Sequence, residues 1–334
     1  MTDVSQCAAT WLAPRDPRLP AAVAHLDRAC TGLWIAGRSD VLHRGVRIGI
    51  VGSRQPRADS AAHARRIAFE AASAGMTIVS GLAMGIDGIA HRGALDAGGT
   101  TIAVLAGGLG RVHPARHVAL AQEIAGSESQ RGVVAGHHAS ARGAVLSEYG
   151  AGSEVSHAWQ FQARNRIIAA LSDYVVIIQA KPRSGSLGTA EAALNLGVPI
   201  GVVPSAPNDE CYTGSIELVR DGADSVVDVR SLARRLELHG VMRDGFHEAV
   251  ARGASVDVEQ RGNWLEPSAA DEGGTGAVQL RIRSELRDHL RVPRVLDEFA
   301  ELTKQSLTEA RKSLLELEAA GEVALRSDGS WQAT

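Results

Sequence analysis

Between residues 46 and 229, six short apolar runs alternate with longer, alanine-rich stretches. The apolar runs are Val46–Val51, Met76–Ser80, Thr100–Leu105, Ala144–Ser147, Tyr174–Gln179 and Val198–Val203. Runs of this length, bounded by glycine or polar residues, are typical of strands that are buried on both faces. The stretches with helical apolar spacing are Ser60–Ala74, Ile86–Ala97, Val118–Ala125, Gln160–Leu171 and Thr189–Leu196. This alternation predicts an α/β fold with a doubly wound, mostly parallel sheet.

The remaining segments differ in character from this domain. Residues 231–277 lack a sustained period and become rich in Gly, Ala, Ser and acidic residues, which predicts a linker. After residue 278, two helical patterns precede two short strands around Asp328-Gly329, a dipeptide typical of hairpin turns. We therefore expect an N-terminal extension (1–43), the α/β domain (44–230), a linker (231–277) and a small winged-helix domain (278–334).

Composition narrows the classes to which the chain can belong. It has 334 residues, of which 45% are hydrophobic and 22% charged, and its formal net charge is −3, as in ordinary soluble globular proteins. No apolar run approaches the roughly 18–20 residues of a membrane span, and no signal peptide is visible. Because Cys7, Cys30 and Cys211 have no CxxC spacing, we expect unpaired thiols in a reducing cytoplasm and no cysteine metal site.

The turn after the first predicted strand, GIVGSR at residues 49–54, is rich in glycine and precedes a predicted helix. Glycine lets backbone N–H groups approach a phosphate, and the dipole of the following helix favours negative charge there. The GxGxxG fingerprint of dinucleotide-binding folds is absent. Arg54, a permanently charged phosphate ligand, stands in its place, although a solvated loop arginine explains this residue equally well.

A second turn of this kind, SGLAMGID at residues 80–87, follows the second predicted strand. Asp87 can cap the next helix, and His91 lies four residues later on the same helical face. The two residues are either a catalytic pair or a structural pair that orients the loop. We favour the structural pair, because no nucleophile is suggested nearby.

Two further cationic segments lie at predicted helix starts. In RNR at 164–166, a spacing of two points Arg164 and Arg166 in different directions, so that one contacts a ligand while the other pairs internally. The loop KPRSGSLGT at 181–189 carries two cations and opens another helix. In an open α/β sheet, such strand ends form one crevice. Several arginines and N–H groups gathered there suit several phosphates better than one small acid.

The charge is unevenly distributed along the chain. Residues 44–190 contain 15 Arg and Lys against 9 Asp and Glu, a local excess of +6, so the rest of the chain carries −9. The positive balance is confined to the domain that holds the loops. This pattern favours a groove that binds a phosphate backbone over a general polyanion-binding surface.

These motifs, in this order, resemble the DNA-processing protein A (DprA/Smf) family. The matching segments are VGSR (51–54), SGLA with GID and AH (80–91), TIAVL (101–105), SEY (147–149), Phe161 with RNRIIA (164–169) and RSGSL (183–187). The resemblance spans about Leu33 to Val229, and the winged-helix pattern is similar to the family's optional third domain. It implies a Rossmann-like domain that binds and protects single-stranded DNA, forms a homodimer and loads the RecA recombinase during natural transformation. It implies no catalytic reaction, cofactor or metal, and no membrane partner.

The resemblance also implies roles for particular residues. Gly52, Ser53 and Arg54 would hold a DNA phosphate, and Phe161 would offer a face to a base, a contact worth about 1–3 kcal/mol. The full set of candidate DNA-binding residues is Gly52, Ser53, Arg54, Gly81, Arg116, Phe161, Arg164, Asn165, Arg166, Lys181, Arg183, Ser184 and Gly185.

The chain departs from the family pattern in several places. The family's N-terminal helical domain is largely missing, and a segment of about 126–142 is an insertion. The cation after the third strand lies one place later, at Arg116, and the usual Phe-Pro is Phe161-Gln162. These differences affect RecA contact and dimer geometry more than DNA binding.

Two other functions fit parts of the sequence. Nucleotide phosphoribohydrolases of the lysine-decarboxylase-like type have a PGGxGTxxE loop, to which GSLGT at 185–189 is similar. The position of their glutamate is Ala192 here, and Glu191 stands one place early, so hydrolysis would lack its general base. The other alternative is a DNA-binding regulatory module. Its predicted recognition helix, 306–318, carries three glutamates beside two cations, which favours protein contact or weak DNA binding.

Overall fold

The structure is a computed structural model that describes residues 4, 9–24, 26, 30–126, 142–205, 209–242, 250, 314, 323–325 and 331–333. The chain divides into two compact units, Met1–Glu266 and Pro267–Thr334. In the second unit, β10 (Val323–Leu325) pairs antiparallel with β11 (Trp331–Ala333), as expected of the predicted hairpin. Most of the predicted winged-helix domain, and nearly all of the predicted insertion, lie outside the described residues.

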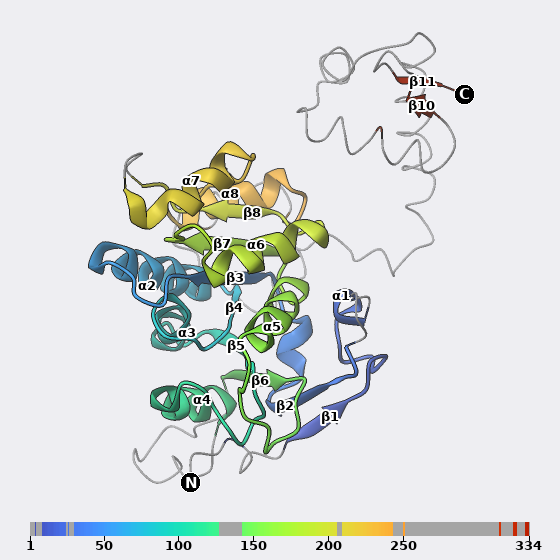
Figure 1. The fold of residues 1–334 in the computed structure, drawn as a ribbon, viewed down its shortest axis with the longest axis vertical. Coiled ribbons are helices and arrows are strands. Elements are labelled where there is room, and N and C mark those ends of the chain that lie inside the picture. Colours follow the sequence, from blue (N-terminus) through green and yellow to red (C-terminus); the bar gives the residue numbers. More distant parts are fainter. Residues whose placement is uncertain are drawn as a thin grey trace. The chain divides into compact units, whose positions relative to one another are not determined.

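The first unit is built on one nine-stranded sheet (Figure 1). Its strands are β1 (Thr10–Leu12), β2 (Leu33–Gly37), β3 (Arg47–Gly52), β4 (Thr77–Ser80), β5 (Thr100–Val104), β6 (Gly143–Ser147), β7 (Tyr174–Ile178), β8 (Ile200–Val202) and β9 (Asp224–Ser225). Their spatial order is β1-β2-β6-β5-β4-β3-β7-β8-β9. Strands β3 to β9 pair in parallel, whereas β2 pairs antiparallel with both β1 and β6. The predicted mostly parallel, doubly wound sheet is confirmed.

Helices cover both faces of the sheet. They are α1 (Ala21–Ala24), α2 (Ala58–Ser73), α3 (Ile86–Asp96), α4 (Val118–Ala125), α5 (Trp159–Ala170), α6 (Gly185–Asn195), α7 (Thr213–Arg220) and α8 (Val229–Leu238). Short 3-10 helices are η1 (Asp40–His43), η2 (Ala115–His117) and η4 (Glu210–Tyr212). Helices α2, α3, α4 and α8 lie on one face, and α5 and α6 lie on the other (Figure 1).

The central strand β3 shows why these sequences form strands buried on both faces. Ile48 and Ile50 pack with α2 and α3, whereas Val51 points to the opposite face, where α5 and α6 lie. All three side chains are buried, and burying such a side chain contributes roughly 1.5–3 kcal/mol. The alternation gives each face of the sheet an apolar surface, and the helices cover it.

Two parts of the unit differ from the sequence-based expectation. Residues assigned to an N-terminal extension contribute β1 and β2, which extend the sheet beyond β6. Strand β1 has three residues, too few for an apolar run to stand out, and β2, with five, precedes the alternation of strands and helices from which the sheet was predicted. Helix α8 lies largely inside the predicted linker, 231–277, and buries Leu232 and Leu236. The apolar residues of α8 are separated by arginines, so this part of the sequence showed no sustained apolar period and was predicted as a linker.

Candidate nucleic-acid interface

The candidate site lies where the order of the strands reverses. Strands β3 and β7 are parallel neighbours, but the chain continues from β3 to β4 on one side and from β7 to β8 on the other. Open α/β sheets bind ligands at the carboxyl ends of strands at such a point. A cavity of about 460 Å³, here called the first cavity, opens there. It is lined by Val51, Gly52, Ser53, Arg54, Ala83, Asp87, Ala158, Phe161, Gln162, Arg164, Asn165, Lys181, Ser184, Gly185, Ser186 and Thr189.

Most of the residues predicted to bind DNA come together in this cavity. Those that line it are Gly52, Ser53, Arg54, Phe161, Arg164, Asn165, Lys181, Ser184 and Gly185. The others, Gly81, Arg116, Arg166 and Arg183, do not line it. The lining residues outside the predicted set are Val51, Ala83, Asp87, Ala158, Gln162, Ser186 and Thr189. Two of them are helical neighbours of predicted residues, because Ala158 lies three residues before Phe161 at the start of α5 and Thr189 lies four residues after Gly185 in α6. Helical spacing applied to the predicted residues would have found them.

Glycine is required at the end of β3. A Cβ atom at Gly52 would lie 1.9 Å from the carbonyl oxygen of Ile178 in β7, so the strands approach more closely than a side chain allows. The N–H of Ser53 donates to the same carbonyl at 3.4 Å, and the carbonyl of Ser53 accepts from the N–H of Ile86 at 3.1 Å. The turn that carries Arg54 is thereby fixed to both β7 and α3.

Arg54 is held in place by an aromatic ring. The guanidinium carbon lies 4.6 Å from the ring centroid of Phe161, within the range of a cation–π interaction. Arg54 makes no ion pair with any residue that the structure describes. One face of Phe161 is therefore covered by the arginine. A base approaching from that side meets the guanidinium plane, which also stacks on bases.

Arg164 supports the cavity from inside. Its side chain is 4% exposed, and its Nη1 donates to the carbonyl oxygens of Gly81 and, at 2.9 Å, of Val104. Asp87 accepts hydrogen bonds from the N–H groups of Gly81 at 3.1 Å and of Ala83 at 3.4 Å. Burial raises the pKa of the Asp87 carboxyl and lowers the pKa of the Arg164 guanidinium, and the opposite charge of each offsets part of the change. Together these side chains fix the β4–α3 turn.

The other arginine of the RNR segment turns away from the cavity. Arg166 forms an ion pair with Glu148, with 2.5 Å between Nη2 and Oε1. Arg166 is thus an arginine that pairs internally, as expected of one of the two, whereas contact of the other with a ligand stays a prediction and the Arg164 guanidinium is already bonded to backbone carbonyls. The predicted pairing of Asp87 with His91 is wrong, because Asp87 bonds to backbone N–H groups and His91 Nδ1 bonds to the hydroxyl of Thr101 at 2.7 Å. Burial lowers the pKa of His91 to about 3.

Helix α6 presents its N-terminus to the cavity. The hydroxyl of Ser184 bonds to that of Ser186 at 2.7 Å, and no side chain caps this end of the helix. Asn165 Nδ2 donates to the carbonyl of Gly185 at 2.9 Å and holds the end of α6 against α5. An uncapped helix N-terminus favours an anion. Lys181, which makes no ion pair with a described residue, lines the same space.

The loops around the cavity have unusual backbone geometry. Leu82, Gln179 and Arg183 are the described non-glycine residues with positive φ, at 55°, 54° and 60°. All three follow β4 or β7. Gln179 Oε1 accepts from the N–H of Arg57 at 2.9 Å, which holds the start of α2. Such conformations cost about 1–3 kcal/mol each and persist where the surroundings impose them, often at binding sites.

The cavity is suited to binding anions. Among the described lining residues, Asp87 carries the one carboxylate, and its hydrogen bonds to the β4–α3 turn engage it. Glu191, the acidic residue nearest to the phosphoribohydrolase pattern, is exposed and does not line the cavity. Among the described residues there is no cluster of metal ligands and no helix long and apolar enough to cross a membrane, and Cys30 and Cys211 are unpaired.

Fold and cavity together define a doubly wound α/β protein with an arginine- and lysine-lined cavity at the carboxyl ends of its strands. The chain belongs to the DNA recombination-mediator protein A family, whose sequence profile matches residues 10–237. It is 29% identical to protein Smf of Synechocystis sp. over 330 residues, which cover 94% of this chain and 77% of that protein. It is 35% identical to DNA processing protein DprA of Bacillus subtilis over 204 residues, 61% of this chain and 63% of that protein.

Solved structures agree with this assignment. DprA of Streptococcus pneumoniae superposes with a TM-score of 0.59 at 32% identity, over 67% of this chain and 73% of that one. DprA of Helicobacter pylori, a structure that describes a single-stranded DNA binding mode, gives 0.58 at 30% identity over 69% of this chain and 95% of that one. The resemblance to the DprA/Smf family is confirmed. The family is one of DNA-processing proteins, and the phosphoribohydrolase alternative is set aside.

Proposed function

We propose that this chain binds single-stranded DNA in the first cavity, protects it, and loads the RecA recombinase onto it during natural transformation or another recombination pathway. The observation that carries the proposal is the position of Arg54. It has no ion-pair partner among described residues, it is fixed over Phe161, and it shares a cavity with Lys181 and the uncapped N-terminus of α6. Two cations and a helix N-terminus match the spaced negative charges of a nucleic-acid backbone.

A single strand fits this site better than a duplex. The cavity lies between strand ends and helix termini, so its cations line a recess instead of a broad surface. An unpaired strand can turn a phosphate and a base into such a recess, whereas a duplex keeps its bases stacked inside. The single-stranded DNA binding mode described for the H. pylori relative supports the same choice.

Contact with RecA, homodimer formation and a cytoplasmic location are proposed from family membership. Catalysis, a cofactor and a metal have no place in the proposal, because binding and transfer of a strand require only reversible contacts. RecA loading is tested by RecA filament formation on DNA coated with single-strand-binding protein, with and without this chain. An accelerated start of filament formation is expected, and unchanged kinetics would contradict loading while leaving DNA binding standing.

The replacement Arg54→Ala tests the DNA site directly. Removing the charge-assisted contact to a phosphate costs about 1.5–3 kcal/mol, so we expect affinity for a labelled oligo-dT to fall about 10- to 100-fold in fluorescence anisotropy. Arg220→Ala, which removes an exposed arginine of α7 outside the first cavity, is the matched control and should bind normally. An unchanged affinity of Arg54→Ala, or equal binding of single and double strands by the wild type, would contradict the proposal.

A further inference from the structure

Trp159, the first residue of α5, is the most exposed of the Phe, Tyr and Trp residues that the structure describes. It is 56% exposed, compared with 42% for Phe69 on α2 and 38% for Trp11 on β1. A single exposed apolar side chain is common on protein surfaces and does not by itself mark a site. Trp159 is distinguished by its position beside the first cavity and by the support that its ring receives.

Helix α5 places Trp159 at the edge of the first cavity. Ala158, the preceding residue, and Gln162, three residues later, both line this cavity. Residues three apart on a helix are neighbours on its surface. Trp159 therefore lies beside the first cavity without lining it.

The aromatic ring inside the first cavity is already partly covered. Phe161 is the one Phe, Tyr or Trp among the described lining residues. The Arg54 guanidinium lies over its ring at 4.6 Å, and the ring of His113 approaches it to 5.9 Å between centroids, tilted by 57°. Phe161 thus has at most one free face for a base, and the next base of a bound strand needs another ring.

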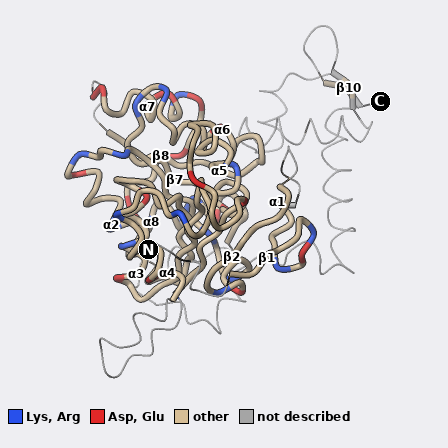
Figure 2. Tube along the Cα trace, turned by 60° about the horizontal axis from the view of Figure 1, so that its bottom comes forward, with Lys and Arg blue, Asp and Glu red and all other residues tan. Residues whose placement is uncertain are grey.

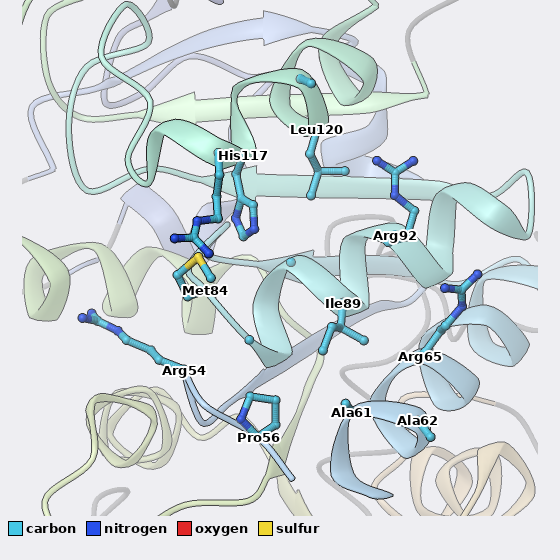
Figure 3. A pocket seen from close by; sticks show the side chains of 14 residues that line it. Arg54, Pro56, Ala61, Ala62, Arg65, Met84, Ile89, Arg92, His117 and Leu120 are labelled. Atoms are coloured by element: carbon cyan, nitrogen blue, oxygen red, sulfur yellow. The ribbon is translucent and has the colours of Figure 1, made fainter. Parts of the chain in front are cut away.

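The neighbouring cavity provides no such ring. It has a volume of about 730 Å³, is formed by α2, α3 and the segment from η2 to α4, and shares Arg54 with the first cavity (Figure 3). Its walls between the arginines are formed by aliphatic side chains such as those of Pro56, Ile89 and Leu120 (Figure 3). No Phe, Tyr or Trp is among its described lining residues. The exposed ring that adjoins the first cavity is that of Trp159.

Gln160 fixes the turn that carries the indole ring. The Gln160 side chain is buried, and its Oε1 accepts hydrogen bonds from the N–H groups of Ser156 at 2.8 Å and His157 at 2.9 Å. Its Nε2 donates at 3.4 Å to the carbonyl of Ala106, just beyond β5. The start of α5 is thereby joined to the sheet, and binding does not have to order it.

His157 supports the indole ring of Trp159. The two rings are nearly parallel, with 19° between their planes and 6.4 Å between their centroids. This spacing is that of offset-stacked aromatic rings. The indole is therefore held in one orientation while more than half of the residue stays accessible to solvent.

The charges near the ring do not oppose a nucleic acid. No acidic residue stands in the first turn of α5, and Glu154, five residues before Trp159, is paired with Arg111 at 3.2 Å. The N-terminus of a helix also carries a partial positive charge. A polyanion can therefore approach the first cavity from this side.

We propose that Trp159, backed by His157, stacks on one base of the bound single strand, a base that lies outside the first cavity. The inference rests on the proposed function and adds to it a second base contact, on α5. Stacking on an aromatic ring tolerates every base, because each base has a π-face. The contact therefore raises the affinity for the strand and holds its register against the first cavity without a sequence preference.

Removal of single bases tests this inference on the full chain. The shortest oligo-dT that binds with full affinity is compared, in fluorescence anisotropy, with copies in which one nucleotide at a time lacks its base. For the wild type, one abasic position should lower the affinity about 5- to 100-fold, the contribution of one stacked base. Trp159→Ala should weaken binding of the intact strand by the same factor and should no longer respond to that position. A general loss of structure would not produce this non-additivity.

Tryptophan emission gives a second measurement, because a base stacked on an indole quenches its fluorescence. Oligo-dT should quench the emission of the wild type. Trp159→Phe should keep most of the affinity, since a flat ring remains, but should lose the quenching. Trp11→Ala removes an exposed tryptophan outside both cavities and is the matched control. It should keep the affinity, the quenching and the response to the abasic position.

Three results would overturn the inference. They are wild-type affinity in Trp159→Ala, an unchanged response of this variant to every abasic position, and equal losses in Trp159→Ala and Trp11→Ala. Normal DNA binding by Trp159→Ala together with a failure to start RecA filaments would assign the ring to a protein partner instead. If the wild type binds no oligonucleotide, or if Arg54→Ala binds normally, the proposed function itself fails, and this failure is distinct from that of the platform.

Discussion

Arg54 and Arg164 line the same cavity and yet have different roles. Arg164 is almost fully buried, and its guanidinium bonds to backbone carbonyls at the ends of β4 and β5. Arg54 lies over Phe161 without an ion-pair partner among described residues. In the sequence, Arg54 follows a predicted strand and Arg164 lies near the start of a predicted helix, and these positions alone could not separate a ligand-facing arginine from an internal one. The burial and the hydrogen bonds of the two side chains in the structure distinguish their roles.

His91 makes the stability of the protein sensitive to acid. Burial lowers its pKa to about 3 in the folded state, with the nearby charges of His117 and Arg164 acting in the same direction, against 6.5 for an unperturbed histidine. Below pH 6.5 the unfolded chain therefore binds a proton that the folded protein does not, and stability falls as the pH drops toward 3. From pH 7 to pH 5 this residue should remove about 2 kcal/mol of unfolding free energy.

Urea unfolding at both pH values measures this effect. In His91→Gln, a side chain that does not titrate takes the place of the imidazole, so the variant should lose about 2 kcal/mol less than the wild type between pH 7 and pH 5. The raised pKa of Asp87 is common to both proteins and cancels in the comparison. Parallel pH profiles would show that His91 is not the titrating group.

Among the secondary-structure elements, those with a clear apolar pattern were predictable. Helix α4 occupies the predicted residues, 118–125, and the strands β3 to β7 begin and end within one residue of prediction. Strands β1 and β2, as well as α8, were not predictable, because their stability comes from packing on the sheet and not from a local pattern. The first cavity followed from glycines and cations at strand ends. The cavity of about 730 Å³ between α2, α3 and the segment from η2 to α4 did not, since it depends on how α3 and η2 pack.

A pair of glycine replacements tests how the elements are joined at the site. In Gly52→Ala, the new methyl group would lie 1.9 Å from the Ile178 carbonyl, so β3 and β7 must separate. We expect a loss of about 1–3 kcal/mol in unfolding free energy, measured by urea denaturation. In Gly185→Ala no atom lies within 4 Å of the new methyl group, and alanine favours a helix. This control should be as stable as the wild type or more so, and equal losses in both variants would contradict the argument.

At the scale of the whole molecule, the net charge of the basic segment is larger than the charge that its unpaired side chains could offer to an anionic ligand. Figure 2 shows Lys and Arg interspersed with Asp and Glu along the described chain. Many arginines of the basic segment 44–190 are paired, as in Arg47–Asp173, Arg65–Asp96, Arg92–Glu123, Arg111–Glu154 and Arg166–Glu148. The local excess of +6 thus reduces to a few unpaired cations near the cavities, among them Arg54, Arg116 and Lys181.

The salt dependence of DNA binding should reflect the small number of unpaired cations near the cavities. For a single strand, the logarithm of the binding constant falls with the logarithm of salt concentration at about −0.7 per neutralised phosphate. Three or four contacts predict a slope of roughly −2 to −3, and Arg54→Ala should make the slope shallower by about 0.7. Titrations between low and physiological salt give both values. A much steeper slope, unaffected by Arg54→Ala, would indicate binding elsewhere on the surface.

The pairing of β3 with β7 also determines at which stage of protein synthesis the first cavity can form. Arg47 and Asp173, at the start of these strands, are 126 residues apart in the chain and yet bonded to each other. A ribosome that has released only the first half of the domain has therefore produced the turn with Arg54 without the strand that supports it. The cleft can form only after β7 and the start of α6 have emerged. A nascent or prematurely terminated chain that lacks them carries Arg54 but not the cavity that this arginine lines.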